Sequence, residues 1–280
     1  MPKLLTPEQV AAFHRDGFVA PLRVLSPVET AAYRQRFEDY ERHHDGWYTL
    51  SKGQKIHLLQ TWVAELVRNE RVLDAVQDVL GADILCWGTS LFVKDPRDPH
   101  FVSWHQDSTY WGLDRPDVVT AWVALSATTQ ASGCMKMIPG SHIWSQIPHR
   151  DTLAEHNLLT RGQEVAVEVD ESKAAYIELA PGEISLHHVR SVHASEPNQA
   201  DDRRIGVALR YIAPHVRQLN GERDSAMLVR GEDRFGNFVH EKPPKRDMDA
   251  SALDEHARVM KLRQEILYEG VEGKPAHTDT

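Results

Sequence analysis

The hydrophobic and polar positions follow two different rhythms along the chain, and the change falls near residue 83. Before it, apolar residues recur with helical spacing. Thr6 and Ser26 each place a hydroxyl N-cap directly before a proline, and Gly17 follows the first of these stretches as a helix stop. These signals predict helices over about residues 6–17, 26–43 and 70–80.

From Asp83 onward the chain consists of short apolar or alternating runs, which are separated by Gly, Pro, Asp and Ser. Examples are ILCWGTSLFVK, VVTAWVAL, GEISLHH and RRIGVALRYI. Such runs predict a mainly β fold with flanking helices, a sandwich or barrel and not a βαβ fold. A final amphipathic helix is predicted over about residues 251–268. We therefore expect a single domain over 1–280, with a helical part (1–82), a β core (83–240) and a C-terminal helix and tail (241–280).

Composition and charge narrow the class of protein. The 280 residues are 41% hydrophobic and 26% charged, as in an ordinary globular protein with a real core. The net charge of −9, without a long Lys/Arg block, argues against a nucleic-acid partner. The two cysteines, Cys86 and Cys134, are expected to be buried thiols in a reducing cytoplasm. We expect a cytoplasmic protein without a membrane partner, and the sequence leaves its oligomeric state open.

The stretch WHQDSTYW, residues 104–111, carries the first candidate chemistry. On a strand, His105 and Asp107 would project from the same face. An imidazole and a carboxylate held in this way can occupy two adjacent positions on one metal ion. A third ligand would complete the 2-His-1-carboxylate face of non-haem Fe(II) oxygenases. The alternative is a strand histidine paired with a neighbouring acid.

The third ligand must come from further along the chain. The stretch EISLHHVRSVHASEPN offers three candidates, His187, His188 and His193, and their spacing and chemistry do not separate them. Alternatively, one of them binds the metal while another donates a hydrogen bond to the ligands without touching the metal. Downstream, Arg203 and Arg204 open the strand IGVALRY, so one guanidinium is expected to point inward. A buried arginine needs an anion, and its planar fork suits a carboxylate.

These motifs resemble those of a known family. The WHQD box, VVTAWVAL followed by GCMKMIPGSH, and HASEPN followed by the Arg-Arg pair occur in the order found in the phytanoyl-CoA dioxygenase family of Fe(II)/2-oxoglutarate oxygenases, over about residues 83–212. The resemblance points to the branch that includes ectoine hydroxylase. It implies a double-stranded β-helix core, also called a jelly roll or cupin-like fold. It also implies Fe(II), 2-oxoglutarate and O₂ as cofactor and cosubstrates.

The resemblance also implies a role for each motif residue. Its His-x-Ser-x-x-Asn motif matches residues 193–198, which selects His193 as the distal metal ligand, and its cosubstrate-binding arginine lies eleven residues further on. His187 and His188 then have structural or supporting roles. Because Asp107 is present where halogenating relatives carry a small residue, hydroxylation is preferred. The implied metal ligands and catalytic residues are His105, Asp107 and His193, and the implied 2-oxoglutarate-binding residues are Arg204, Ser195 and Trp122.

Candidate substrate residues flank these motifs. Tyr110 and Trp111 follow the metal motif and either face the pocket mouth or pack at its rim. Lys94, on the strand before WHQD, either meets an anion or is a solvated lysine at a strand end, which is the simpler expectation. His57 lies in SKGQKIHLL with Lys52 and Lys55, and this segment either closes over the site or has no part in it.

Three functions agree with these features. The first is hydroxylation of a small polar metabolite, such as an amino acid derivative, a quaternary amine or an aminophosphonate, with release of succinate and CO₂. The second is hydroxylation of an acyl group on CoA or a carrier protein, which should need an exposed apolar or basic docking surface. The third is a jelly-roll protein that binds a metal or ligand without catalysis. A cosubstrate-binding arginine argues against the third, because binding alone does not need it.

Overall fold

The computed structural model describes residues 2–47, 54–159, 162–221 and 223–267, and of these the side chains of Tyr110 and of residues 264–267 are left aside. Within these ranges no helix is both long enough and apolar enough to cross a membrane. The helices are α1 (Pro7–Asp16), α2 (Pro27–His43), α3 (Thr61–Leu66), α4 (Glu70–Leu80) and α5 (Ala250–Leu267), and the 3-10 turns are η3 (Ile56–Leu58), η4 (Asp107–Tyr110), η5 (Ser141–Ile143) and η6 (Glu171–Lys173).

The predicted helix ends are confirmed by their caps. The Thr6 hydroxyl accepts a hydrogen bond from the Gln9 backbone, and the Gln9 side chain accepts one from the Thr6 backbone. Ser26 and Glu29 form the same capping box at the start of α2. Gly17 ends α1 with φ +84°, a conformation that favours glycine. The short helix α3 was not predicted.

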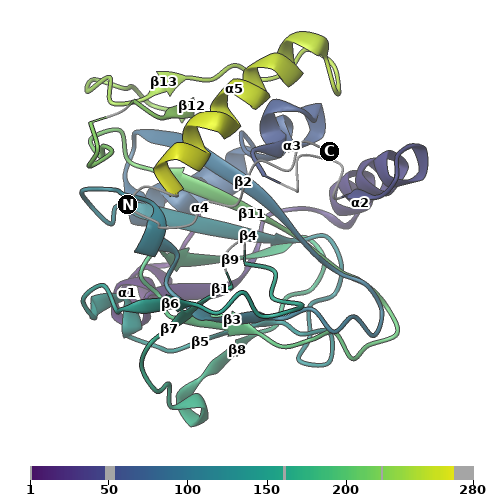
Figure 1. Cartoon of the computed structure of the whole chain (residues 1–280), viewed down its shortest axis with the longest axis vertical. Helices are drawn as coiled ribbons and strands as arrows, with labels where there is room; N and C mark the ends of the chain where they lie inside the picture. The colour runs from purple at the N-terminus through teal and green to yellow at the C-terminus, as the bar shows by residue number, and fades with distance from the viewer. Residues whose placement is uncertain (1, 48–53, 160–161, 222, 268–280) are drawn as a thin grey trace.

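The larger sheet has seven strands in the order β1-β9-β4-β11-β2-β12-β13 (Figure 1). Its central pairs are antiparallel, with Gly206 to Ile212 of β11 opposite Ala124 to Val118 of β4. The strands are β1 (Phe18–Arg23), β2 (Ile84–Lys94), β4 (Val118–Ala124), β9 (Glu183–His188), β11 (Arg204–Ile212), β12 (Ser225–Arg230) and β13 (Val239–His240).

A smaller four-stranded sheet, in the order β3-β10-β5-β8, faces the larger one and lies below it in Figure 1. Trp122 of β4 and Met135 of β5 pack together between the two sheets. This is the predicted jelly-roll core. The remaining strands are β3 (Val102–His105), β5 (Met135–Met137), β8 (Ala175–Ile177) and β10 (His193–Ser195), with β6 (His149–Asp151) and β7 (Gln163–Val165) paired separately.

The N-terminal part is less purely helical than the sequence predicted. Residues 18–23 form β1, which pairs with β9 at the edge of the large sheet. Its register is irregular between Val19 and Leu22, where Pro21 has no backbone N–H to donate. An edge strand tolerates such a residue, but the proline interrupts the alternation by which a strand is recognised.

Strand β11 separates two environments. Ile205, Val207 and Leu209 point outward into the main hydrophobic core, where α1 to α4 cover the sheet. Arg204, Gly206, Ala208 and Arg210 alternate with them and point inward, between the two sheets. The inner face of this strand therefore carries two arginines toward the pocket that holds the predicted metal ligands.

Candidate metal centre and cosubstrate pocket

Three side chains from two strands and one turn meet between the sheets. His105 at the end of β3 lies directly opposite His193 at the start of β10, and their ring centroids are 4.1 Å apart. Asp107 completes the group, because one potential ligand atom of each residue lies within 4.8 Å of the others. The three side chains are suitably placed to share one metal ion.

The route by which Asp107 reaches this point differs from the prediction. Strand β3 ends at His105, and Asp107 is the first residue of the turn η4. The expectation that both residues project from one strand was therefore wrong. Gln106 is still extended and joins β3 to η4, and the Asp107 carboxylate lies 3.5 Å from His105 Nε2.

Backbone hydrogen bonds fix both imidazoles. The Nδ1 atoms of His105 and His193 each donate to the carbonyl oxygen two residues earlier, at Ser103 and Ser191, over 2.9 Å. This leaves each Nε2 free to bind a metal, the arrangement by which outer hydrogen bonds orient metal-binding histidines. Burial lowers the pKa of His193 well below its ordinary value, so the ring is neutral.

The acid of the group is ionised. Burial raises the pKa of Asp107, but the contact with the His105 ring and the charge of Arg210 outweigh it and lower the pKa below its ordinary range. Two imidazoles and one carboxylate form a donor set that suits Fe(II). The residues present therefore fit the implied metal.

The other candidate histidines lie on β9 and face different surroundings. His187 is buried and lines the same pocket, with Nε2 4.0 Å from Asp107. Its Nδ1 has no hydrogen-bond partner, and burial lowers its pKa to about 4. His188 points to the other face of the strand, toward His142. The two side chains therefore lie on opposite faces of the strand.

A buried cationic group lies beside the metal ligands. Arg204 is 1% exposed, and its Nη1 donates to the carbonyl of Gly133, while its Nε has no hydrogen-bond partner. Lys94 is fully buried and donates to the Ser195 hydroxyl over 2.8 Å. Neither cation forms an ion pair with any acid in the described ranges. Two buried cations without a counterion make a receptor for an anion.

The electrostatics of this group agree with its geometry. Burial, and then the nearby charge of Arg204, lower the pKa of Lys94 to about 6. Burial also lowers the pKa of Arg204 to about 10. Burial is the largest cause of both shifts, and a bound carboxylate would oppose them by favouring the charged forms.

Trp122 forms part of the pocket wall beside Arg204. Its ring lies 5.5 Å from the Arg204 guanidinium and is buried. It also lies flat across Gly206, where an added Cβ would come within 1.8 Å of a ring atom. Glycine is required at this position because the indole occupies the space of a side chain.

The prediction for Lys94 needs correction. A solvated lysine at a strand end was the simpler expectation, but the side chain lies on the inner face of β2 and is fully buried. The register explains the difference, since Lys94 pairs with Arg204 and directly paired residues share a face of the sheet. It lies behind Ser195, on the cosubstrate side of the pocket.

Of the other proposed substrate residues, His57 and Trp111 do not line the pocket. His57 is buried on the outer face of the sheet, bonded to Glu241 and next to Thr89. Trp111 packs against Trp87 in a separate hydrophobic cluster. The side chain of Tyr110, and Lys52, lie outside the described residues.

The sequence interpretation missed Arg210. It lies on the same face of β11 as Arg204 and lines the pocket near Asp107. The alternation of RRIGVALRY contained the signal, because residues 204, 206, 208 and 210 share one face. The pocket is lined by Phe92, Val102, His105, Asp107, Thr120, Trp122, Met135, His187, His193, Ala194, Ser195, Arg204, Ala208 and Arg210.

Comparison with known proteins agrees with this geometry. Residues 13–206 match the phytanoyl-CoA dioxygenase (PhyH) family. A probable alpha-ketoglutarate-dependent hypophosphite dioxygenase of Stutzerimonas stutzeri is 26% identical over 200 residues, which cover 70% of this chain and 69% of that protein. An ectoine dioxygenase of Nocardia farcinica is 30% identical over 151 residues, 48% of this chain and 50% of the relative.

A solved structure is similar over nearly the whole chain. The apo form of the non-heme monooxygenase ThoJ is 36% identical, with a TM-score of 0.84, and the match covers 93% of this chain and 98% of that one. The chain belongs to the phytanoyl-CoA dioxygenase family and is an Fe(II)- and 2-oxoglutarate-dependent dioxygenase that uses O₂.

Proposed function

We propose that this dioxygenase hydroxylates an unactivated C–H bond of a small polar metabolite, such as an amino acid derivative, a quaternary amine or an aminophosphonate. The observation that carries the proposal is the buried Arg204 in the same pocket as a 2-His-1-carboxylate group, with the buried Lys94 behind Ser195. Such a pocket holds an anionic cosubstrate next to a metal. The reaction releases succinate and CO₂ from 2-oxoglutarate.

His105, Asp107 and His193 hold Fe(II) and are the catalytic residues. When bound, the iron supplies the redox chemistry that couples oxidation of 2-oxoglutarate to oxidation of the substrate C–H bond. The chain contributes position and a dry environment. The backbone acceptors at Ser103 and Ser191 keep both rings directed at the metal position and hold the proton on Nδ1.

Arg204 and Ser195 bind the distal carboxylate of 2-oxoglutarate, and Trp122 forms the adjoining wall. A guanidinium binds a carboxylate through two parallel hydrogen bonds, and Arg204 Nε is without a partner for this purpose. Lys94 donates to the Ser195 hydroxyl, so the hydroxyl proton is available to the cosubstrate. Lys94 also adds a second positive charge behind Ser195.

The preference for a small polar substrate rests on the lining of the pocket and on the relatives. Thr120, His187 and Arg210 give the wall near Asp107 a polar character that a long alkyl chain would not match. The names of the relatives specify hypophosphite and ectoine, which are both small and polar.

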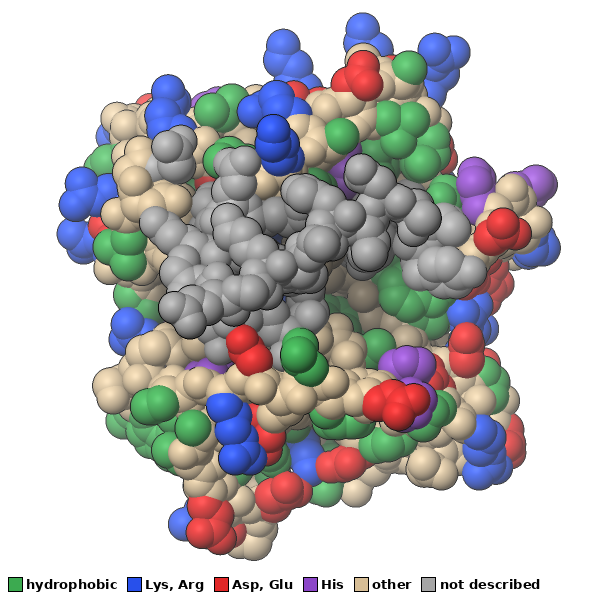
Figure 2. Space-filling view, in the orientation of Figure 1, with side chains coloured by type: hydrophobic (Ala, Val, Ile, Leu, Met, Phe, Trp, Pro, Cys, Tyr) green, Lys and Arg blue, Asp and Glu red, His purple; other side chains and the backbone are tan. Residues whose placement is uncertain are grey.

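The two alternatives have less support. A CoA or carrier-protein substrate should need a basic or apolar docking surface, and on the lower half of the face in Figure 2 the coloured Lys and Arg side chains are interspersed with Asp and Glu. A binding protein without catalysis would not belong to a family of enzymes with a cosubstrate.

We also propose that residues 1–280 act as one dioxygenase domain. A segment near the start of the described chain forms a strand of the large sheet, and a segment near its end packs on the outer face of that sheet. β1 pairs with β9, and Glu241 bonds to Lys55, which is 186 residues away. Removal of either end would expose these contacts.

Succinate release with Fe(II) and 2-oxoglutarate tests the proposal across amino acids, quaternary amines, aminophosphonates and acyl thioesters. We expect one of the small polar classes to stimulate release and thioesters to have no effect. His105→Ala, Asp107→Ala and His193→Ala should abolish release, while His188→Ala should retain it. Stimulation by thioesters alone would contradict the proposal.

A further inference from the structure

Arg210 has no role in holding the cosubstrate and no acidic partner of its own. Its Nη1 donates to the Ser90 hydroxyl over 2.8 Å, and its guanidinium lies over the ring of Trp111 at 5.3 Å. Its Nε is shielded from solvent without a hydrogen bond. Within the described ranges it forms no ion pair, and the acid that acts on it is Asp107, which the metal would engage.

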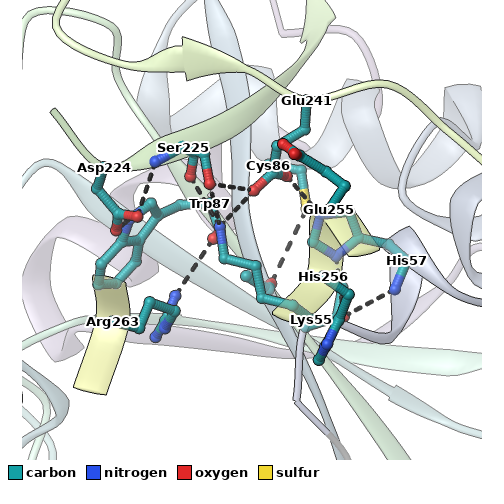
Figure 3. Close-up of polar contacts among 12 residues, drawn as sticks. Lys55, His57, Cys86, Trp87, Asp224, Ser225, Glu241, Glu255, His256 and Arg263 are labelled. Atoms are coloured by element: carbon teal, nitrogen blue, oxygen red, sulfur yellow. Dashed lines mark hydrogen bonds and ion pairs between the residues drawn. The ribbon is translucent and has the colours of Figure 1, made fainter. Parts of the chain in front are cut away.

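A second arginine approaches from the C-terminal helix. Arg263 of α5 is buried, lies over the ring of Trp87 at 4.6 Å, and reaches the Trp87 carbonyl with Nη1 at 3.5 Å. Figure 3 shows its guanidinium beside this indole. Its Nε also has no hydrogen-bond partner, and it has no ion pair with a described acid. The two tryptophans touch edge to face, with ring centroids 4.9 Å apart.

Gly88 places both guanidinium groups on one side of the sheet. It pairs directly with Arg210 across β2 and β11, so a side chain at either position points to the same face. A Cβ built on Gly88 would lie 3.3 Å from Arg263 Nη1. Arg263 therefore lies over the glycine next to Arg210, where a larger residue would displace it.

This pair is separate from the cosubstrate group. Arg204 and Arg210 are six residues apart on one strand, which places their Cα atoms about 20 Å apart. One 2-oxoglutarate molecule is much shorter than this distance. Arg204 lines the end of the pocket with Ser195, and Arg210 lies at the end with Asp107 and His187.

Two like charges held together without an acid are costly, and proteins keep such groups where a ligand supplies the opposite charge. Each guanidinium lies over an indole ring that holds it in place, so little rotational freedom is lost when an anion binds. The Ser90 hydroxyl adds a further polar group at the same position.

We propose that Arg210 and Arg263, with Ser90, bind an oxyanion of the primary substrate, either a carboxylate or a phosphonate. This inference rests on the proposed function and narrows it. It selects amino acid derivatives and aminophosphonates, and it excludes a quaternary amine without an acidic group. The oxidised carbon then lies between the oxyanion and the metal.

Equilibrium binding of minimal ligands tests the inference without turnover. The probes are acetate and methylphosphonate, with acetamide and dimethyl methylphosphonate as matched neutral compounds. The full chain is loaded with Fe(II) and saturating 2-oxoglutarate in the absence of oxygen. The 2-oxoglutarate then occupies the site at Arg204. Binding is measured as relaxation of the ligand methyl protons by the paramagnetic iron.

We expect at least one of the two anions to bind with a Kd at least tenfold lower than that of its neutral counterpart. The tighter anion identifies the source of the oxyanion. Arg210→Met and Arg263→Met should each weaken its binding at least tenfold, and Arg210→Lys should restore part of it. Arg258→Met is the control, because Arg258 lies on the same helix but is ion-paired with Glu255 at the surface.

Several results would overturn the inference. Equal binding of the anions and the neutral compounds to the wild-type chain would overturn it, and this result does not depend on whether a variant folds. Unchanged Kd values in both methionine variants would also overturn it. A loss of Fe(II) affinity in Arg210→Met without a change in anion binding would assign Arg210 to positioning Asp107 instead. Failure of the proposed function is distinguishable, because then no small polar compound stimulates succinate release from 2-oxoglutarate.

Discussion

Two groups of buried charged side chains lie on opposite faces of the large sheet. On the outer face, Lys55 and His57 surround Glu241 (Figure 3). On the inner face, Lys94, Arg204 and Arg210 point into the pocket region. Both groups remove charges from water, but only the outer one contains an acid that pairs with its cations.

The outer group, Lys55–His57–Glu241, is complete in itself. One oxygen of Glu241 accepts from Lys55 and from the Ser225 hydroxyl, and the other accepts from His57 Nε2 over 2.8 Å. Burial raises the pKa of Glu241, but the charges of Lys55 and His57 outweigh it and lower the pKa to about 2. The inner cations have no such partner. A charge that is buried and paired stabilises a fold, and one that is buried and unpaired indicates a ligand.

Breaking the outer group should have the largest effect on stability. Glu241→Gln leaves Lys55 buried without a counterion, and we expect a loss of about 3 kcal/mol in the free energy of unfolding. Urea denaturation measures this loss. The double variant Lys55→Met, Glu241→Leu should recover most of the stability, because it removes both charges. A Glu241→Gln protein as stable as wild type would show that this ion pair contributes nothing.

Neutralising an inner cation should affect ligand binding and not stability. Arg204→Met should raise the KM for 2-oxoglutarate about 100-fold, because a paired guanidinium–carboxylate contact is worth about 2–3 kcal/mol. Without 2-oxoglutarate, the variant should melt at or above the wild-type temperature, since an uncompensated charge has been removed. A lower melting temperature with an unchanged KM would show that Arg204 stabilises the fold and does not bind 2-oxoglutarate.

A smaller effect should appear in the pH dependence of 2-oxoglutarate binding. The pKa of Lys94 is about 6 in the empty pocket, and a nearby carboxylate raises it toward its ordinary value. Binding therefore takes up a proton above pH 6, so affinity should fall as pH rises, by up to about tenfold per pH unit. Below pH 6, Lys94 is already charged and affinity should level off. Calorimetric titration in two buffers measures the proton uptake, and Lys94→Met should abolish it.

Much of the fold was predictable because its signals are local. Caps and glycine stops define α1, α2 and α4, and alternation defines the central strands. Strand β1 was missed because Pro21 breaks its alternation, and its partner β9 lies far along the chain. Propensity alone does not reveal such an edge strand.

In the candidate site, too, some features were predictable from the sequence and others were not. The residue types and the order of the motifs indicated a metal ligand set and a cosubstrate arginine, although the turn that carries Asp107 was taken for a strand. Arg210 could have been found from its parity with Arg204. The pairing of His57 with Glu241 could not, because nothing in the local sequence links residues 184 positions apart.

The most direct test of the central claim is the binding of Fe(II) to single-residue variants, measured by equilibrium dialysis without oxygen. The wild-type chain should bind about one equivalent. His105→Ala, Asp107→Ala and His193→Ala should each lose this binding, while His187→Ala, whose imidazole lines the same pocket, should retain it. Retention of iron by His193→Ala together with its loss from His187→Ala would contradict the account.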